Sequence, residues 1–201
     1  QKDCEYPDKN LAGVGVAFKL AHALLREREK EHLVPYFLKV VAIGTIADVM
    51  KLTGENRAIV AIGLRDLPAA KNYGLKALME VSDCRAEMTS YHIGFRIAPR
   101  INAAGRMDAA KHVVELLEAD SYKRARELAE YLNNKNIERQ KVQKDITELA
   151  LLETGDLSSR KFIVVMGKGW HRGVIGLAAS RIAEKLHRPT IVLSLDDDGM
   201  G

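Results

Sequence analysis

The sequence predicts an α/β protein with a mostly helical first part, one long connecting helix and a final strand–helix–strand unit. Three observations predict this class. Apolar residues recur at spacings of three and four through the first 118 residues, which is typical of helices packed on a core. Residues 121–154 contain neither glycine nor proline, so they favour one uninterrupted helix. From residue 161 onward, two β-branched runs flank a glycine-rich turn and a further helical pattern.

The first part contains a succession of helical patterns. They cover residues 9–30, 35–43, 56–64, 75–81, 90–98 and 108–118. Pro35 fits the first turn of the second helix, where no N–H is needed. Thr89 or Ser90 can cap the fifth helix. We expect that helix to end near Ala98, because Pro99 disfavours helical backbone in the residue before it.

The long helix, residues 121–154, would span roughly 50 Å at ~1.5 Å per residue. Lys135 and Arg139 interrupt its apolar seam in the middle. A helix that is apolar at both ends and polar between them is typical of a bridge between two bodies. A coiled-coil dimer is the alternative, and the two charged seam positions count against it.

The last part predicts a βαβ unit. Residues 161–166 are a β-branched run typical of a buried strand, residues 174–186 a helix, and residues 189–195 a second strand. Strands joined in this way by a crossover helix pair in parallel. The chain therefore divides into the back of one α/β domain, a connecting helix and the front of a second domain, at residues 1–118, 119–156 and 157–201.

The composition, with 47% hydrophobic and 29% charged residues among 201, is that of a globular protein and excludes disordered or collagen-like chains. A formal net charge of +4 permits an anionic partner without requiring one. The most apolar run, residues 33–50, is interrupted by Lys39 and Asp48, so we expect no membrane span and no membrane partner. Cys4 and Cys84 form no C-x-x-C pair, and a reducing, cytoplasmic setting fits them.

Both ends of the sequence have the character of cut ends. The chain begins at Gln1 rather than Met and stops in a turn-like Asp-Asp-Asp-Gly-Met-Gly. We therefore expect it to be a piece of a larger protein. A truncated first part would expose apolar surface of residues 9–30 and 40–46, which would favour self-association of the isolated chain.

Asp48 is the first candidate for chemistry, because it follows an apolar segment and stands between Ala47 and Val49. A lone carboxylate there is costly to bury unless it caps a helix, pairs with a cation or binds a metal. A cap or an ion pair is the commoner explanation. The six histidines form no H-x-H or H-E-x-x-H pair. A two-metal phosphoesterase site needs several carboxylates and histidines, so we expect that this chain cannot complete one by itself.

Arg96, Arg100 and Arg106 lie in a locally basic stretch that also contains Pro99 and Gly105. The proline and the glycine predict a shaped loop rather than a helix face. Arginines on a rigid loop suit bidentate contact with phosphate. The small residues before and at Gly105 would let a backbone approach closely. Pairing of these arginines with acidic residues of the same fold is an equally weighted alternative.

The turn Gly167–Gly173 is the third candidate, because it joins a predicted strand to a helix N-terminus, where free N–H groups attract anions. Lys168, His171 and Arg172 add charge, and Trp170 could stack on a base or a sugar. The spacing matches neither G-x-G-x-x-G nor the P-loop. A tight turn with Trp170 as a lid on the core is the slightly favoured alternative.

Three segments together resemble one family. They are Gly44-Thr45-Ile46-Ala47-Asp48-Val49, Arg100-Ile101-Asn102-Ala103-Ala104-Gly105-Arg106 and Trp170-His171-Arg172-Gly173-Val174-Ile175-Gly176. In this order and spacing the chain, from Leu11 onward, resembles the RecJ family of single-strand-specific 5′→3′ DNA exonucleases, in the DHH phosphoesterase superfamily. The resemblance implies a metal-dependent enzyme that hydrolyses phosphodiesters of single-stranded DNA in DNA repair and recombination. Residues 1–118 would be the end of a DHH domain, 119–156 the connecting helix, and 157–201 the start of a DHHA1 domain.

The resemblance implies a metal role for Asp48, which matches a metal-binding aspartate of the DHH domain. It would hold one of two Mn²⁺ or Mg²⁺ ions in the intact enzyme. The family's earlier metal motifs would lie upstream of Gln1, so we expect the chain alone to be inactive. Lys51 and Arg172 depart from the family's usual residues, which are proline at the first position and a small residue or proline at the second.

The resemblance also implies contacts with single-stranded DNA. Arg100 and Arg106, with Asn102, match a loop that reaches over the active site toward the DNA backbone, and Arg100 would also take part in catalysis. Trp170 and His171, followed by Arg172, match the motif at the beginning of the second domain, which binds single-stranded DNA in the family.

Two other functions stay open. Relatives within the superfamily cleave short oligonucleotides or cyclic dinucleotides instead of long strands. A non-catalytic nucleic-acid-binding module would keep the fold without a working metal site.

Overall fold

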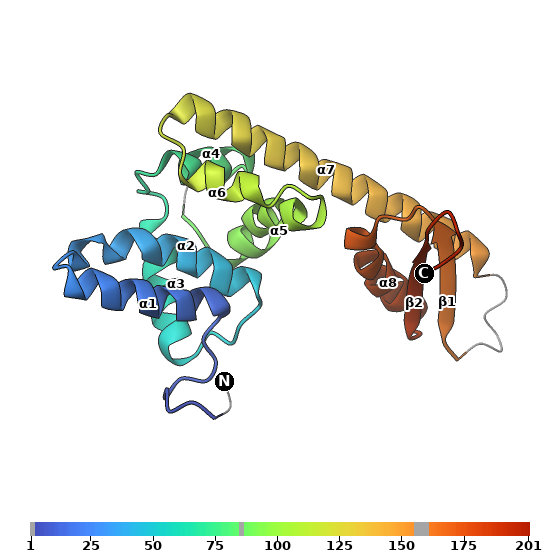
Figure 1. Cartoon of the computed structure of the whole chain (residues 1–201), viewed down its shortest axis with the longest axis horizontal. Helices are drawn as coiled ribbons and strands as arrows, with labels where there is room; N and C mark the ends of the chain where they lie inside the picture. Colours follow the sequence, from blue (N-terminus) through green and yellow to red (C-terminus); the bar gives the residue numbers. More distant parts are fainter. Residues whose placement is uncertain (1–2, 85–86, 155–160) are drawn as a thin grey trace. The chain divides into compact units, whose positions relative to one another are not determined.

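The chain folds into two compact units, which are described in turn (Figure 1). The structure is a computed structural model, and it describes residues 3–84, 87–154 and 161–201. Unit 1 comprises Gln1–Ile101 and Lys111–Tyr131, and unit 2 comprises Asn102–Ala110 and Leu132–Gly201. The described part is mostly helical with one short parallel sheet, so the predicted α/β class is confirmed.

Unit 1 is built of helices close to the predicted positions. Its described elements are α1 Gly13–Glu27, the 3-10 turn η1 Glu31–Leu33, α2 Val34–Ala47, α3 Gly54–Asp66, α4 Tyr73–Val81, the π-helix η2 His92–Ile97, the start of α5 Ala98–Arg106, α6 Lys111–Leu117 and the start of α7 Tyr122–Glu153. Pro35 stands in the first turn of α2, as predicted.

The first three helices lie side by side in unit 1 (Figure 1). They enclose a core cluster of Phe18, Val41 and Ile59, one residue from each helix. Helices α2 and α3 approach most closely at Gly63, where a Cβ atom would lie only 2.4 Å from the Cβ of Ala42. Glycine therefore permits the contact that fixes these two helices against each other.

The apolar surface expected in the first part is found on α1 but not at residues 41–43 of α2. Val16, Leu20 and Leu24 of α1 are exposed. Residues 41–43 of α2 are buried, so the expectation that residues 40–46 expose apolar surface is wrong for the middle of that segment. The physical reason is that α2 packs against both α1 and α3.

The expected break at Pro99 is wrong, because the backbone stays helical from Ser90 to Arg106. The N–H of Ala98 bonds the carbonyl of Ile93, five residues back, as in a π-helix. A π turn is wider than an α turn, so the proline ring meets less crowding from the preceding turn and the helix continues. The arginines of this stretch stand on helices, and the predicted loop does not form.

Helix α7 is the predicted long helix and contains 32 residues. Tyr122–Tyr131 belong to unit 1 and Leu132–Glu153 to unit 2, a distribution that a connecting helix would have. No helix in the described part of the chain combines the length and the apolar character needed to cross a membrane.

Unit 2 contains the predicted βαβ unit. β1 Ile163–Lys168 and β2 Thr190–Leu195 pair in parallel, and α8 Arg172–Leu186 connects them (Figure 1). The core of unit 2 contains residues from the two strands, from α8 and from α7: Ile146, Ala150, Ile163, Val165, Val174, Ala178, Ile182 and Val192.

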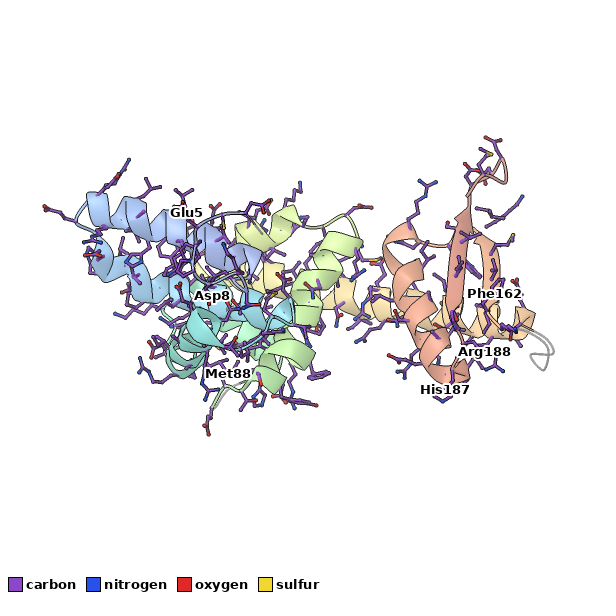
Figure 2. All side chains as sticks on the ribbon, turned by 90° about the horizontal axis from the view of Figure 1, so that it is seen from below. Glu5, Asp8, Met88, Phe162, His187 and Arg188 are labelled. Carbon is purple, nitrogen blue, oxygen red and sulfur yellow. The ribbon has the colours of Figure 1, made fainter. Side chains whose placement is uncertain are left out.

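Only one face of the sheet is packed by described residues. Ile163 and Val165 point into the core, and the side chains between them point the other way, as in any strand. The opposite face exposes Phe162, Val164, Met166, Ile191 and Leu193. Phe162, just before β1, is 62% exposed (Figure 2). The prediction of a buried strand is therefore right for one face and wrong for the other, because α8 and α7 cover a single side.

Candidate functional site

Asp48 stands at the C-terminal end of α2. The N–H groups of Val49 and Met50 bond back to the carbonyls of Ile46 and Thr45 at 3.0 and 3.3 Å, which closes the helix in a Schellman pattern. Val49 takes a φ of 54° in this pattern. Left-handed backbone is rare for a β-branched residue, so the turn directly after Asp48 holds conformational strain.

The side chain of Asp48 is exposed, because the apolar segment before it ends inside the unit and the helix end turns to solvent. The burial cost that made Asp48 a candidate therefore does not arise. Its carboxylate forms neither a hydrogen bond nor an ion pair with another described residue, so the cap and ion-pair alternatives are not seen there.

A metal site needs several ligands, and Asp48 fits as one of them. Among the described residues, no group of three or more His, Cys, Asp or Glu side chains is placed to hold a metal ion. The described part of the chain therefore does not complete a metal site.

Helix η2 passes the end of α2 that carries Asp48, since a Cβ atom at Gly94 would lie 4.0 Å from Cγ2 of Ile46. The exposed rings of Tyr91, the residue before η2, and Phe95 on η2 contact each other in a tilted arrangement with their centroids 4.9 Å apart. Sequence analysis missed this pair, although the i, i+4 spacing of two aromatic residues indicates a shared helix face. Exposed aromatic rings are a surface on which nucleobases can stack.

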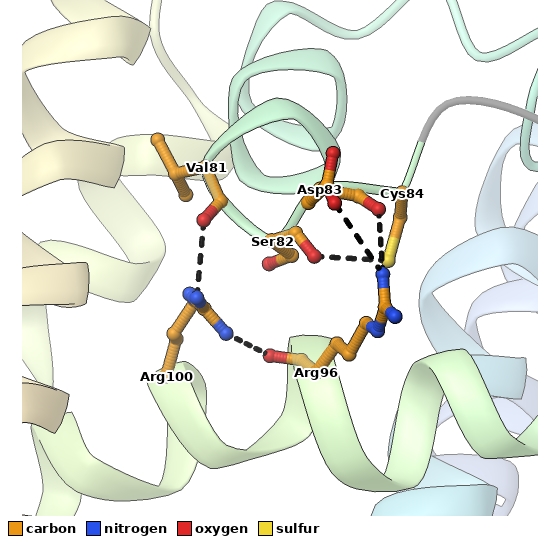
Figure 3. A network of polar contacts seen from close by, with 6 residues as sticks. All are labelled: Val81, Ser82, Asp83, Cys84, Arg96 and Arg100. Atoms are coloured by element: carbon orange, nitrogen blue, oxygen red, sulfur yellow. Dashed lines mark hydrogen bonds and ion pairs between the residues drawn. The ribbon is translucent and has the colours of Figure 1, made fainter.

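Arg96 and Arg100 bind the C-terminal end of α4 (Figure 3). Nη1 of Arg96 donates to the carbonyl of Asp83 at 2.8 Å and lies 3.8 Å from Oδ2 of the same residue. Nη2 of Arg100 donates to the carbonyl of Val81 at 3.0 Å, and its Nη1 donates to the carbonyl of Arg96. Cations at a helix C-terminus are stabilised by its dipole, so both guanidinium groups have a structural role.

The surroundings of these two arginines are partly buried. Burial lowers the pKa of Arg100, and burial raises the pKa of the neighbouring Cys84 thiol. The predicted alternative, pairing within the fold, is therefore found in part. The contacts seen among the described residues are mainly with backbone carbonyls, together with the carboxylate of Asp83 beside Arg96.

Asn102 and Arg106 lie four residues apart on α5, and both are exposed. Nη1 of Arg106 donates to the carbonyl of Gly173 at 3.3 Å, which places it beside the first turn of α8. Ala103 and Ala104 are buried, so these small residues let α5 pack closely and do not form an open surface for a ligand.

The predicted turn before α8 is shorter than expected, because β1 runs on through Gly167 and Lys168. His171 caps α8: its Nδ1 accepts a hydrogen bond from the N–H of Gly173 at 3.1 Å. Trp170 is 9% exposed and packs in the core of unit 2. Its ring lies against Gly167, where a Cβ atom would lie 2.1 Å from Cε2 of the indole. The core-lid alternative thus describes its packing, and base stacking by Trp170 stays a prediction.

The structure brings some predicted residues together and leaves others apart. Within unit 2, Arg106 adjoins the helix start that carries His171 and Arg172. Asp48 and Arg100 belong to unit 1. Sequence analysis treated Arg139 of α7 only as an interruption of the apolar seam. That interruption was the signal that could have drawn attention to its hydrogen bonds with Asn136 and Gln143.

Comparison with known proteins points to one class, the single-stranded-DNA-specific exonucleases. The chain is 43% identical over 201 residues to such an exonuclease from Bacillus subtilis, with 98% of this chain and 25% of the relative covered. The Escherichia coli relative is 38% identical over 215 residues, with coverages of 98% and 37%. Both relatives are RecJ proteins, so the predicted resemblance to RecJ is confirmed. No family model matches the chain.

The fold leads to the same proteins. Crystal structures of RecJ from Thermus thermophilus in complex with Mg²⁺ and with Mn²⁺ match with a TM-score of 0.83 at 36% identity. The match covers 94% of this chain and 30% or 28% of those chains. The chain thus spans between a quarter and somewhat over a third of the length of the curated RecJ relatives described above.

Proposed function

We propose that the chain is the central part of a metal-dependent exonuclease that hydrolyses phosphodiesters of single-stranded DNA from the 5′ end in DNA repair and recombination. The observation that carries this proposal is the similarity to RecJ along 98% of the chain. The same fold, at a TM-score of 0.83, supports it. A net charge of +4 agrees with a polyanionic substrate.

In this proposal the C-terminal part of a DHH domain comprises residues 1–118. The helix that connects the two domains comprises residues 119–156, and the N-terminal part of a DHHA1 domain comprises residues 157–201. Two observations support the partition. One boundary between the compact units falls within α7, between Tyr131 and Leu132, whereas Asn102–Ala110 belong to unit 2 and depart from the proposed first domain. The chain after α7 forms a βαβ unit, a common beginning of an α/β domain.

Asp48 is proposed as one ligand of a Mn²⁺ or Mg²⁺ site whose other ligands lie outside this chain. Metal ions at such a site activate water and stabilise charge on the phosphoryl oxygens. The carboxylate of Asp48 is exposed at a hydrogen-bonded helix end, and no described residue forms a hydrogen bond or an ion pair with it. It is therefore available to bind a metal ion, which supports the assignment. The isolated chain is accordingly proposed to be inactive.

Helix α5 is proposed to face the DNA backbone. Asn102 and Arg106, one turn apart and exposed, would contact phosphates directly. Arg100 lies two residues before Asn102 and binds the end of α4, so it fixes the position of α5. Its contact with the scissile phosphate rests on the RecJ motif. On α8, the exposed Arg172 is proposed to contact the DNA strand, while His171 caps the N-terminus of the helix.

A comparison of substrates tests the proposed function. The longer protein that contains this chain is given Mn²⁺ and three DNAs: a long 5′-phosphorylated single strand, its duplex and a dinucleotide. We expect nucleotide release from the single strand, with much less from the duplex. Preference for the dinucleotide would instead favour the short-oligonucleotide function. Binding of the single strand without any hydrolysis would favour the non-catalytic module.

A further inference from the structure

Arg139 is a partly buried cation in the middle of α7, and no carboxylate among the described residues neutralises it. Its Nη2 donates to Oδ1 of Asn136 at 2.7 Å, and its Nη1 donates to Oε1 of Gln143 at 2.8 Å. Both acceptors are neutral amides on the same helix. In the described part of the chain, Arg139 forms no ion pair with Asp or Glu.

Arg106 brings a second positive charge to the same place. It bonds the carbonyl of Gly173, and Nε2 of Gln143 donates to the carbonyl of Leu177 at 3.4 Å. These two carbonyls lie one helical turn apart on α8, so Arg106 and Gln143, the residue that holds Arg139, adjoin the same part of that helix. The charge of Arg106 is near enough to act on the guanidinium of Arg139. Arg106 has no described carboxylate partner either. All of these residues belong to unit 2.

The two charges raise the energy of the unliganded fold. Burial lowers the pKa of Arg139, and the charge of Arg106 lowers it further. If the only role of Arg139 were to pack against its neighbours, an aliphatic side chain would continue the apolar seam without the free-energy cost of a partly buried charge. Asn136 and Gln143 instead hold the planar guanidinium in place and leave its charge intact. An anion placed beside both arginines would gain from that charge without reorganising the site.

We propose that Arg106 and Arg139 hold one phosphodiester group of single-stranded DNA between them, with Asn136 and Gln143 as positioning residues. This inference rests on the proposed function and deepens it: it adds a phosphate contact on α7 that none of the three motifs contains. The contact recognises the backbone, so it is independent of base sequence.

The test measures binding of a fluorescent oligothymidylate single strand to the longer protein over a range of salt concentrations, without divalent metal. We expect Arg139→Met to weaken binding about tenfold, the effect of losing one charge-assisted hydrogen bond. The slope of log affinity against log salt should fall by about 0.7, because one phosphate contact is lost.

Lys141→Met is the matched control. Lys141 is exposed on the same helix, two residues further and therefore about 200° around its axis. Its removal takes away the same charge from the opposite face, so both affinity and slope should stay at the wild-type values. An effect as large as that of Arg139→Met would mean that net charge, and not this pair of arginines, sets the affinity, and it would overturn the proposal.

Two further measurements test the proposal. Arg139→Met should leave the melting temperature nearly unchanged, because removal of an uncompensated charge offsets the hydrogen bonds lost to Asn136 and Gln143. A lower melting temperature with wild-type binding would make Arg139 structural and overturn the proposal. If both arginines hold one phosphate, Arg106→Met combined with Arg139→Met should weaken binding by less than the product of the single effects.

Each remaining outcome also supports or overturns the proposed phosphate contact. Should Arg139→Met fail to fold, Arg139→Lys keeps the charge and loses the planar fork, and we expect about threefold weaker binding at an unchanged salt slope. Wild-type affinity in that variant would contradict the proposal. Binding by the wild type but equally by Arg139→Met overturns the phosphate pair alone. A wild-type protein that does not bind single-stranded DNA overturns the proposed function together with this inference.

Discussion

Asp48 is held at the end of α2 by a turn that glycine would form more easily. The Schellman pattern requires left-handed backbone at Val49, and its side chain is 88% exposed, so packing does not repay the strain. Strained backbone next to a candidate metal ligand is consistent with a position selected for function over stability.

We expect Val49→Gly to raise the free energy of unfolding by about 1 kcal/mol, because glycine takes positive φ without a Cβ clash. Urea denaturation measures the change. Val114→Gly is the control: Val114 is also exposed, but it lies inside α6 with ordinary φ, so glycine there should destabilise by about 0.5 kcal/mol. Destabilisation by both substitutions would show that Val49 is not strained.

Arg100 combines a structural contact with a proposed role toward DNA. Arg100→Ala leaves the carbonyls of Val81 and Arg96 without this donor, so we expect the free energy of unfolding to fall by about 1–2 kcal/mol. In the longer protein, binding of single-stranded DNA should weaken and its salt slope flatten. A stability loss with an unchanged salt slope would leave Arg100 a structural residue only.

Among the elements, those set by local periodicity were predictable and those set by tertiary contacts were not. The long α7, Pro35 at the start of α2 and the parallel βαβ unit follow from spacing and turn chemistry. The helix through Pro99 does not, because its π turn has no simple sequence pattern. The exposure of Asp48 and the carbonyl contacts of Arg100 depend on where helices end in the folded chain, which local periodicity does not show. The motifs located these residues without showing their contacts.

The close packing of α2 on α3 gives an element-level prediction. Gly63→Ala places a methyl group 2.4 Å from the Cβ of Ala42 and 2.6 Å from the carbonyl oxygen of Leu38. We expect a loss of about 1–3 kcal/mol in the free energy of unfolding, because the two helices must separate. Gly176→Ala is the control on α8. Apart from its chain neighbours and the nearby backbone of α8, no described atom lies within 4 Å of its Cβ position, so the substitution should stabilise by about 0.5–1 kcal/mol. Equal effects of the two substitutions would refute the close contact.

For the whole molecule, two apolar surfaces remain uncovered by described residues. One is the α1 face with Val16, Leu20 and Leu24, and the other is the open face of the β1–β2 sheet. Apolar patches of this kind are typical of surfaces that another protein surface covers. In a longer exonuclease, further parts of that protein would be the natural cover.

The isolated chain should therefore self-associate. Light scattering at rising concentration should give a mass above the 22.3 kDa of one chain. Leu20→Lys and Ile191→Lys, which place a charge on each surface, should reduce the association. Lys144→Glu changes an exposed charge elsewhere on α7 and should not. A clean monomer at every concentration would rule the prediction out.

The most direct test of the central claim is Mn²⁺-dependent nucleotide release from 5′-phosphorylated single-stranded DNA. Three samples are compared: the longer protein, its Asp48→Ala variant and the present chain alone. The account predicts release by the longer protein, loss of release with retained DNA binding in the variant, and no release by the chain. Release by the chain alone would place a complete site within these 201 residues, and undiminished release by the variant would remove Asp48 from it.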